Sequence, residues 1–496
     1  MSGLSGKRTI IGVGLVILIG ILVFRTLSLA PINLSKNEGS GVTLIEVDAN
    51  QTANHLSEAV RFKTISTQDR TLFDPEIFAT FQDWLALTYP NFYAAVSTEM
   101  VAGSSQMNTW AGTDSNLDPV VFLAHQDVVP ADEAPGSGWE KPPFSGLIED
   151  GFIWGRGAID DKGSLIAILE AADRLAASGY QPKRTLIFAF GHDEEVGGPG
   201  AMAIAALLKE RNIHPWAVID EGGAITTNMP DVAGPVARIG VAEKGYLTLI
   251  LTSKAEGGHS STPPVTTSLG ALSRAIAAVE AHPFEQKLDV VLIKMLRATA
   301  RSEEVGFSKR FVLANLWLFG RTVEDALKQS NSGRAMLGTT IAPTILHAGI
   351  KENALPREAQ AFVNFRLHAR DSVADVVAHV RAAIDNPDIE VSIANPPGNE
   401  PSPISQIGTG PYAWLEQAIN DGFPGTLVAP NVVLGGTDSR YFAIVTDDIY
   451  RFAPYTFDSS DFGRIHGLNE RMGVEDFAHG VQVYYLMLER AGQIEN

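Results

Sequence analysis

Histidine and carboxylate side chains gather at three points of the chain where an apolar run ends. The three clusters begin at His125, His192 and Asp220, and each follows a run typical of a strand buried on both faces. In an open α/β sheet, ligand sites form just beyond the carboxyl ends of the strands. The sequence therefore predicts that these side chains meet at one edge of a sheet.

A fourth cluster, the carboxylate pair Asp160 and Asp161, stands just ahead of a predicted helix. Taken alone, this pair could cap the helix, because acidic side chains are favoured at a helix N-terminus. A single His-x-Asp sequence is usually a surface turn, and two adjacent glutamates can belong to a solvated loop. These plain explanations do not account for four acidic clusters at the same edge of one sheet, and their coincidence favours a metal site.

The types of side chain point to zinc. The chain has no cysteine, so a metal must be held by His, Asp and Glu, a donor set that suits a catalytic zinc ion with an open position. Two metals that share a carboxylate can hold a bridging water, lower its pKa and polarise a carbonyl. A further carboxylate must then accept the proton of the water and deliver it to the leaving amine. Of the adjacent Glu194 and Glu195, one can turn to the metal and the other to the water.

The elements that must position these clusters alternate between strand and helix. Strands are predicted at 120–123, 185–188 and 216–219, and residues 164–178 place leucine and isoleucine at helical spacing before Gly179. Strands that alternate with helices form a largely parallel sheet covered on both sides. The predicted fold class is therefore α/β, with a mostly parallel sheet covered by helices.

After the third cluster the pattern changes to strands that alternate between apolar and polar residues. Strands at 246–254, 359–368 and 389–393 are separated by helices at 268–282 and 373–384. This order predicts a smaller α+β unit with its helices on one face of the sheet.

The length of 496 residues predicts two or three domains. A segment rich in proline, glycine and asparagine, residues 395–403, marks a return from the smaller unit to the first one. We therefore expect a catalytic domain formed by residues 51–245 and 395–496, interrupted by an inserted lid domain of residues 246–394.

The composition excludes some classes of function. Hydrophobic residues make up 45% and charged residues 19% of the chain, as in globular proteins. The net charge of −19 and the lack of a basic stripe argue against a nucleic-acid partner, because phosphate binding needs clustered lysine and arginine.

The N-terminus predicts a membrane anchor. Lys7 and Arg8 precede an uncharged run from Thr9 to Phe24, which is followed by Arg25 and a further apolar stretch to Ala30. We expect a cytoplasmic tail at 1–8, a single transmembrane span at 9–30 and a linker at 31–50, with the catalytic part outside the cytoplasm. The alternative is a signal sequence cleaved after Ala30, which would give a secreted or periplasmic protein, although Pro31 should hinder that cleavage.

Seven stretches resemble the dizinc metallopeptidase and aminoacylase family, in the order in which that family has them. The closest resemblance is to the branch with carboxypeptidase S and the N-fatty-acyl-amino-acid synthase/hydrolase, and it covers nearly the whole chain after the anchor. The stretches are AHQDVVP from residue 124, PPFSG from 142, GHDEE from 191, IDEGG from 219, GHSSTPP from 258, TDSR from 437 and RIHGLNE from 464.

The resemblance implies two zinc ions per subunit. It gives the ligands as His125, Asp160, Glu195, Asp220 and His466. Asp160 would bridge the ions from an unusual backbone turn, with His125 and Asp220 completing one zinc site and the other two ligands completing the second. The residues alone leave open whether Asp220 or its neighbour Glu221 is the ligand.

The family also assigns the catalytic and substrate-contacting residues. Asp127 would orient His125, and Glu194 would act first as general base and then as general acid. In dimeric members a lid histidine, matched here by His259, reaches the active site of the partner subunit and hydrogen-bonds the oxyanion. Arg366 suits the grip of a substrate carboxylate, and Asn315 is a weaker candidate for a substrate contact.

The sequence thus predicts an enzyme that hydrolyses the amide bond of a peptide or an N-acyl amino acid bearing a free carboxylate. A zinc-bound hydroxide is expected to attack the carbonyl while Glu194 takes the proton. A carboxypeptidase and an N-acyl-amino-acid synthase/hydrolase both remain open, because they act on the same bond geometry. A non-catalytic binding protein on the same fold is the alternative from another class, although it would be expected to lack a ligand or the base.

Overall fold

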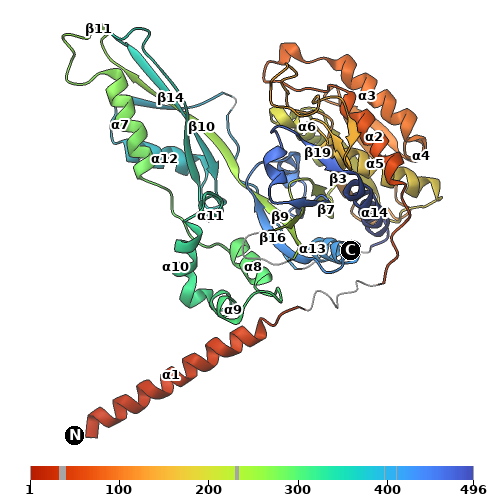
Figure 1. Ribbon diagram of the computed structural model, residues 1–496, viewed down its shortest axis with the longest axis horizontal. Helices are drawn as coiled ribbons and strands as arrows, with labels where there is room; N and C mark the ends of the chain where they lie inside the picture. The colour runs from red at the N-terminus through yellow and green to blue at the C-terminus, as the bar shows by residue number, and fades with distance from the viewer. Residues whose placement is uncertain (1, 33–40, 229–233, 396, 409, 495–496) are drawn as a thin grey trace.

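The computed structural model describes residues 2–32, 41–228, 234–395, 397–408 and 410–494. Figure 1 shows a larger body around β3, β7 and β9, a smaller one that carries β10 and β14, and the helix α1 extending away from both.

The larger body is built on a sheet that has ten strands in the described part of the chain. Its order is β1-β2-β6-β3-β7-β17-β9-β8-β18, and β16 pairs with β9 outside this path. β3 pairs in parallel with both β6 and β7, and β7 pairs in parallel with β17. The strands are β1 (Ser97–Val101), β2 (Ser105–Trp110), β3 (Val120–His125), β6 (Leu186–Gly191), β7 (Ala217–Asp220), β8 (Ile225–Thr227), β9 (Val236–Glu243), β16 (Leu427–Val433), β17 (Ile449–Arg451) and β18 (Thr456–Asp458).

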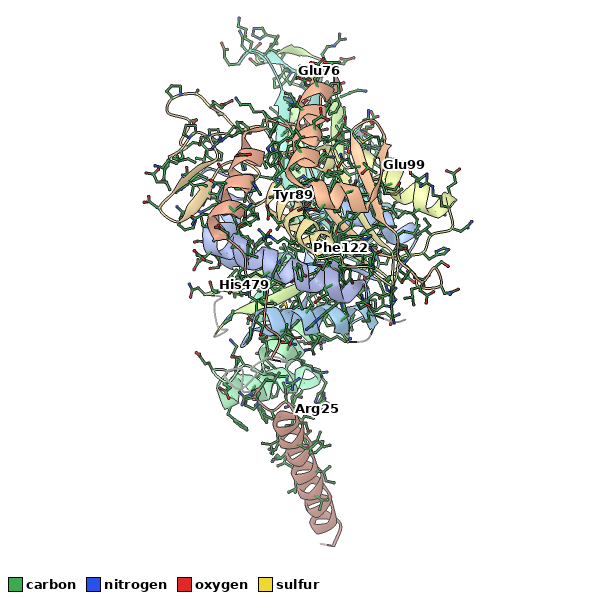
Figure 2. All side chains as sticks on the ribbon, turned by 90° about the vertical axis from the view of Figure 1, so that its right-hand side faces the viewer. Arg25, Glu76, Tyr89, Glu99, Phe122 and His479 are labelled. Atoms are coloured by element: carbon green, nitrogen blue, oxygen red, sulfur yellow. The ribbon has the colours of Figure 1, made fainter. Side chains whose placement is uncertain are left out.

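Helices cover both faces of this sheet. On β3, Val120 and Phe122 belong to the core under one set of helices, while Val121 and Leu123 belong to the core under the other. Figure 2 shows Phe122 and Tyr89 inside this body. The first face carries α2 (Ala49–Arg61), α3 (Pro75–Thr88), α4 (Pro90–Ala95), α5 (Lys162–Ala177), α13 (Gly410–Gly422) and α14 (Val474–Ala491), and the second carries α6 (Pro199–Glu210) and the 3-10 helix η4 (Asp438–Ile444). The predicted α/β fold is confirmed.

The smaller body has a four-stranded antiparallel sheet of order β12-β14-β10-β15. Alternate residues of β10, among them Leu247 and Leu249, and of β14, among them Val363 and Phe365, are buried in its core. The strands are β10 (Gly245–Lys254), β12 (Thr340–Ala348), β14 (Glu358–Leu367) and β15 (Ile389–Ile393), and α7 (Ser268–Ala281) and α12 (Val373–Ile384) pack on one face.

The remaining elements are short. Four helices that the sequence analysis did not predict lie between α7 and β12: α8 (Val290–Thr299), α9 (Phe307–Ala314), α10 (Leu316–Leu327) and α11 (Asn331–Leu337). Two small sheets consist of β4 (Leu147–Glu149), β5 (Phe152–Trp154) and β19 (Arg471–Gly473), and of β11 (Gly258–His259) and β13 (Ala354–Leu355).

The N-terminal helix α1 (Ser2–Ser28) corrects the prediction of a transmembrane span at 9–30. Its last turns contact the protein: the Asn315 side-chain amide donates to the Leu22 carbonyl at 3.2 Å, and Arg25 Nε donates to the Ala314 carbonyl at 3.3 Å. Figure 2 places Arg25 where α1 meets the rest of the molecule. The apolar stretch before these contacts is shorter than the roughly 20 residues that a span needs. Since no helix among the described residues is long and apolar enough to cross a membrane, the transmembrane prediction is wrong.

The predicted domain boundaries stay a proposal. β9 ends at Glu243 and β10 begins at Gly245, so the chain leaves the larger sheet close to the proposed boundary at 245. The predicted linker at 31–50 lies partly outside the described residues, and its end already belongs to α2.

Candidate active site

His125 ends β3 at the carboxyl edge of the sheet. Its Nδ1 lies 2.9 Å from the backbone oxygen of Asp127 and 3.3 Å from Asp127 Oδ1. Its Nε2 faces Asp160 Oδ1 at 2.9 Å and Glu221 Oε1 at 3.4 Å. Burial alone would lower the pKa of His125, but the carboxylates of Asp127 and Asp160 raise that pKa well above its ordinary value. The imidazole is therefore held on one side and presents its other nitrogen to a group of carboxylates.

Asp160 belongs to two groups of possible metal ligands at once. In the first group, the ligand atoms of His125, Asp160 and Glu221 lie within 4.8 Å of one another, and in the second those of Asp160, Glu195 and His466 do. His466 Nε2 lies 3.1 Å from Asp160 Oδ2 and 2.9 Å from Glu195 Oε2. Asp160 thus points one oxygen to each histidine, as a carboxylate that bridges two ions must.

The turn that presents Asp160 is held by Glu470. The buried carboxylate of Glu470 accepts hydrogen bonds from the backbone N–H groups of Gly157, Ile159 and Asp160 at 3.0, 2.9 and 3.1 Å. Arg156 pairs with the other oxygen of Glu470. Glu470 could be predicted only as part of the RIHGLNE stretch, since nothing local to residue 470 indicates that it binds a turn so distant in the chain.

The carboxylate of Asp220, the predicted ligand, lies in neither group. Its Oδ2 accepts a hydrogen bond from Ser439 N at 2.8 Å and its Oδ1 accepts one from Glu221 N at 2.9 Å. Asp220 is the last residue of β7, and its contact with Ser439 directs it to the face covered by η4. Glu221, the next residue, turns instead to His125. Among the described residues, the candidate ligand group around His125 contains Glu221 and not Asp220.

Glu194 lies beside the two groups and belongs to neither. It opens the 3-10 helix η3 (Glu194–Val196), and its backbone N–H donates to Asp127 Oδ1 at 3.2 Å. The N–H of Glu195 donates to the other oxygen of Asp127, also at 3.2 Å. Burial, followed by the charge of Asp438, raises the pKa of Glu194 well above its ordinary value. A carboxyl group with a raised pKa holds a proton more readily than a free glutamate does, which suits a residue that accepts and returns a proton.

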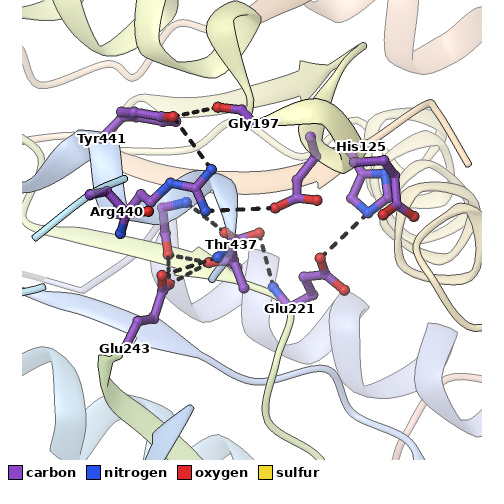
Figure 3. A network of polar contacts seen from close by, with 12 residues as sticks. His125, Gly197, Glu221, Glu243, Thr437, Arg440 and Tyr441 are labelled. Carbon is purple, nitrogen blue, oxygen red and sulfur yellow. Dashed lines mark hydrogen bonds and ion pairs between the residues drawn. The ribbon is translucent and has the colours of Figure 1, made fainter. Parts of the chain in front are cut away.

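Two residues of η4 that were not predicted as site residues face η3 (Figure 3). Arg440 Nη1 lies 3.9 Å from Glu194 Oε1, and the Tyr441 hydroxyl donates to the carbonyl of Gly197, which caps η3. Arg440 is part of the TDSR stretch, but its sequence position gives no sign that it lies beside Glu194.

The predicted substrate contacts fall at different places. Arg366, on β14, stacks on Tyr246 with its guanidinium 4.9 Å from the ring centroid. Burial, together with the charge of Arg440, lowers the pKa of Arg366. Asn315 is fully buried between α9 and α10, and its amide donates to carbonyl groups of α1 and α9. The Asn315 amide is thus used for helix packing, and its contact with a substrate stays a prediction.

His259 lies on β11, at the far end of the smaller body from the metal groups (Figure 1). Its side chain is exposed, and its Nδ1 contacts Ser261 Oγ at 2.8 Å. The structure therefore does not bring His259 to the site of its own chain.

The charge balance of the site fits divalent cations. Glu195 Oε1 is buried and has no hydrogen-bond partner in the described part of the chain. Burial and the charge of Asp160 raise the pKa of Glu221 to about 8, and hydrogen bonds to Asp160 and Glu195 raise that of His466 to about 10. Burial is the largest cause for Glu221, and in both cases nearby carboxylates add to the rise of the pKa. A cation bound between these oxygens and imidazoles would balance the charge of these carboxylates.

Comparison with known proteins identifies one family. A model of Peptidase family M20/M25/M40 matches residues 121–490. The chain is 37% identical over 491 residues to an N-fatty-acyl-amino acid synthase/hydrolase of Xenopus tropicalis, covering 97% of this chain and 94% of that protein. It is 36% identical over 448 residues to the probable carboxypeptidase S-like protein 2 of Dictyostelium discoideum, covering 88% of this chain and 84% of that protein.

Solved structures share the fold. The chain aligns with the M20 family metallo-carboxypeptidase Sso-CP2 of Sulfolobus solfataricus at a TM-score of 0.66 and 17% identity. The alignment covers 90% of this chain and 100% of that protein. Human carnosine dipeptidase 1 aligns at a TM-score of 0.63 and 16% identity, covering 90% of this chain and 97% of that one.

Proposed function

Because the chain belongs to Peptidase family M20/M25/M40, it is a metallohydrolase, and we propose that it hydrolyses the amide bond of peptides or N-acyl amino acids with two zinc ions as cofactors. Membership of this family confirms the resemblance predicted from the motifs. The observation that carries the proposal is the pair of ligand groups that share Asp160.

In this proposal the metal ligands are His125, Asp160, Glu195, Glu221 and His466. The set contains histidine and carboxylate but no sulfur, which suits catalytic zinc, and cobalt or manganese would fit the same donors. When bound, the ions supply Lewis acidity that polarises the substrate carbonyl and lowers the pKa of water. The proposed set contains Glu221 and not Asp220 because Glu221 Oε1 faces His125 Nε2, whereas the Asp220 oxygens face backbone donors.

Glu194 is the proposed general base. Its backbone is fixed by Asp127, which also contacts His125, so one buried carboxylate sets the position of both the base and a ligand. Glu194 takes a proton from the attacking water and returns it to the leaving amine nitrogen. The raised pKa that burial gives the Glu194 carboxyl favours this double role.

A cluster of cations supports a substrate that carries a carboxylate. Burial and the charge of Arg366 lower the pKa of Lys244 to about 8, and the charge of Arg440 acts on Arg366 in turn. Within the described residues, no hydrogen bond or ion pair occupies the Arg366 guanidinium. A substrate carboxylate would relieve the repulsion among these groups, and a guanidinium can grip it with two hydrogen bonds.

The relatives name two substrate classes. One relative is a carboxypeptidase S-like protein and the other an N-fatty-acyl-amino acid synthase/hydrolase. We propose N-acyl amino acids as the preferred substrate class, because the synthase/hydrolase aligns with 97% of the chain. Purified, zinc-loaded protein assayed with Gly-Leu peptides and with N-oleoyl amino acids separates the classes. Metal-loaded protein without turnover on either would favour the non-catalytic alternative.

The exposed position of His259 supports a role in a second subunit. We propose a homodimer in which the lid His259 reaches the site of the partner and donates a hydrogen bond to the oxyanion. Mixing inactive His259→Ala subunits with inactive Glu194→Gln subunits should restore part of the activity, because each mixed dimer then has one complete site. Mixtures as inactive as their parents, or a monomer by sedimentation, would reject the dimer.

The processing of the N-terminus is a separate proposal. Basic Lys7 and Arg8 followed by an uncharged run are compatible with export and removal of this segment. N-terminal sequencing of the mature protein tests this: a start at Pro31 supports cleavage, and a start at residue 1 or 2 rejects it.

Glu194→Gln tests the proposed chemistry. The amide keeps the size of the side chain but cannot take a proton, so we expect kcat to fall by about 10²- to 10⁴-fold, the usual contribution of a general base. Metal content should stay unchanged because Glu194 lies in neither ligand group. Glu99→Gln is the matched control, since Glu99 pairs with Arg211 at the surface away from the site (Figure 2). A Glu194→Gln enzyme with near-normal kcat would remove Glu194 from this role.

A further inference from the structure

A buried carboxylate that the proposed chemistry does not use stands behind the site. Glu243 is the last residue of β9 and is 2% exposed. Its Oε1 accepts hydrogen bonds from Arg451 Nε at 2.5 Å, Thr437 Oγ1 at 2.5 Å and Ser439 Oγ at 3.1 Å. Its Oε2 accepts the backbone N–H of Thr437 at 3.0 Å. Glu243 therefore binds the segment 437–440 through both backbone and side chain.

That segment contacts both sides of the proposed catalytic centre (Figure 3). The N–H of Ser439 donates to Asp220 at 2.8 Å, and Asp220 in turn accepts the N–H of Glu221 at 2.9 Å. The next residue, Arg440, places its guanidinium 3.9 Å from Glu194. A shift of the segment would thus displace a proposed ligand and the surroundings of the proposed base together.

The backbone of Glu243 is itself firmly held. Its N–H donates to Ser402 Oγ at 2.8 Å, and its carbonyl accepts the N–H of Ser402 at 3.1 Å. The buried ammonium group of the next residue, Lys244, donates to the carbonyls of Ala335 and Gly338 at 2.9 and 2.7 Å. The carboxylate is therefore a fixed point, and the segment 437–440 is the part that would move if the contact were lost.

We propose that Glu243 is a positioning residue for catalysis, which holds the segment 437–440 so that Arg440 stands beside Glu194 and Ser439 fixes the Asp220–Glu221 turn. The proposal rests on the proposed function for the meaning of Glu194 and Glu221. Glu243 touches neither ligand group, so its effect reaches the reaction only through the segment that it binds.

Glu243→Gln is the test. The amide retains one acceptor oxygen, but its NH₂ group must face either Thr437 N or Arg451 Nε, both of which are donors. We expect kcat to fall by about 10²-fold, the cost of a displacement of about 1 Å at a catalytic centre, while KM changes by less than about threefold. In saturating zinc both ions should still bind, although the affinity of the site that contains Glu221 is expected to fall. A kcat within threefold of the wild type, or a loss of activity in proportion to lost metal, would overturn the proposal.

A matched control separates positioning from general stability. Asp421 is also a buried carboxylate paired with an arginine, at 2.7 Å from Arg490, but it joins α13 to α14 away from the site. Asp421→Asn should lower the unfolding temperature without lowering kcat. An equal loss of kcat in both variants would show that loss of any buried ion pair lowers kcat, and would overturn the proposal. If Glu243→Gln does not fold, Thr437→Val is the second variant. It removes the hydroxyl contacts to Glu243 and Ser439, leaves the Glu243–Arg451 pair intact, and should lower kcat about tenfold.

Hydrogen exchange of the metal-free protein gives a readout that needs no activity. The amides of residues 437–441 should exchange faster in Glu243→Gln than in the wild type, and as in the wild type in Asp421→Asn. Unchanged exchange in Glu243→Gln would overturn the proposal even if the proposed function stands. Absence of turnover by the metal-loaded wild type would reject the proposed function, while the exchange result would still decide whether Glu243 holds the segment.

Discussion

Replacing Glu221 with glutamine should weaken metal binding more than replacing its neighbour Asp220 with asparagine. The two residues are adjacent and both are acidic, so the two substitutions remove one negative charge each from nearly the same place. They differ in what their oxygens contact: Glu221 Oε1 lies 3.4 Å from His125 Nε2, while Asp220 accepts two backbone hydrogen bonds. This pair of variants therefore tests the choice of ligand and not the local charge.

The expected magnitudes follow from these contacts. Asp220→Asn keeps one acceptor oxygen and loses one backbone hydrogen bond to a charged group, worth about 1.5–3 kcal/mol. Because in the proposed arrangement Asp220 acts on the metal only by holding the Glu221 turn, metal affinity should fall by about 10- to 100-fold, as for other partners that orient a ligand. Glu221→Gln removes an anionic ligand itself, so the affinity of one of the two metal sites should fall by more than about 100-fold.

The assay is a zinc titration of metal-free protein against a chelator of known affinity, followed by metal analysis after dialysis. Wild type and Asp220→Asn should retain both ions, and Glu221→Gln should retain one. The unfolding temperature of each metal-free variant shows whether a loss of binding reflects a loss of fold. Glu221→Gln protein that keeps both ions, beside Asp220→Asn protein that loses one, would refute the reasoning and restore Asp220 as the ligand.

Three further predictions concern other parts of the molecule. Arg366→Met should raise KM for carboxylate-bearing substrates about tenfold or more with a smaller change in kcat, and equal KM values for wild type and variant would exclude the carboxylate contact. Gly146→Ala should lower the free energy of unfolding in urea by more than about 2 kcal/mol, because Gly146 has φ +58° and an added Cβ would lie 2.1 Å from the Ser57 carbonyl oxygen. Gly151→Ala, at φ +78° with nothing within 4 Å, should cost only about 1 kcal/mol. The hydrogen bond to Glu170 raises the pKa of His55. The pair should therefore stabilise the fold fully at a pH below the ordinary histidine pKa of about 6.5, and this stabilisation should be lost as the pH rises through the raised pKa. Glu170→Gln should abolish this part of the pH dependence, measured as free energy of unfolding between pH 5 and 9.

The position of site residues at the ends of buried strands could be predicted from the sequence alone. The apolar runs before His125 and Asp220 are long and continuous, and the rule that parallel strands end at a common edge brings the two clusters together. Asp160 followed from its place before a helix, because that helix, α5, packs on the same sheet. The fold class followed from the same alternation of strand and helix.

Other residues carry no such local signal. His466 lies in an irregular segment at φ +57°, and its approach to Asp160 depends on how the chain returns after the smaller body. Asn315 looked like a polar residue free for a ligand, but its amide is used to join α1 to α9 and α10. The error at the N-terminus has the same origin, since the contacts at Leu22 and Arg25 are made with residues almost three hundred positions away.

The oxygens of the buried carboxylates suggest a rule that composition and spacing do not contain. Asp127, Asp220, Glu243 and Glu470 each accept backbone N–H groups, and each thereby fixes a loop of the site. Asp160, Glu195 and Glu221 instead direct side-chain oxygens at histidine nitrogens, and Glu195 leaves one oxygen without a partner. Backbone donors balance part of the charge of a carboxylate, whereas a carboxylate that faces other carboxylates and imidazoles gains more from a bound cation. This difference is the basis on which we propose Glu221, and not Asp220, as the ligand.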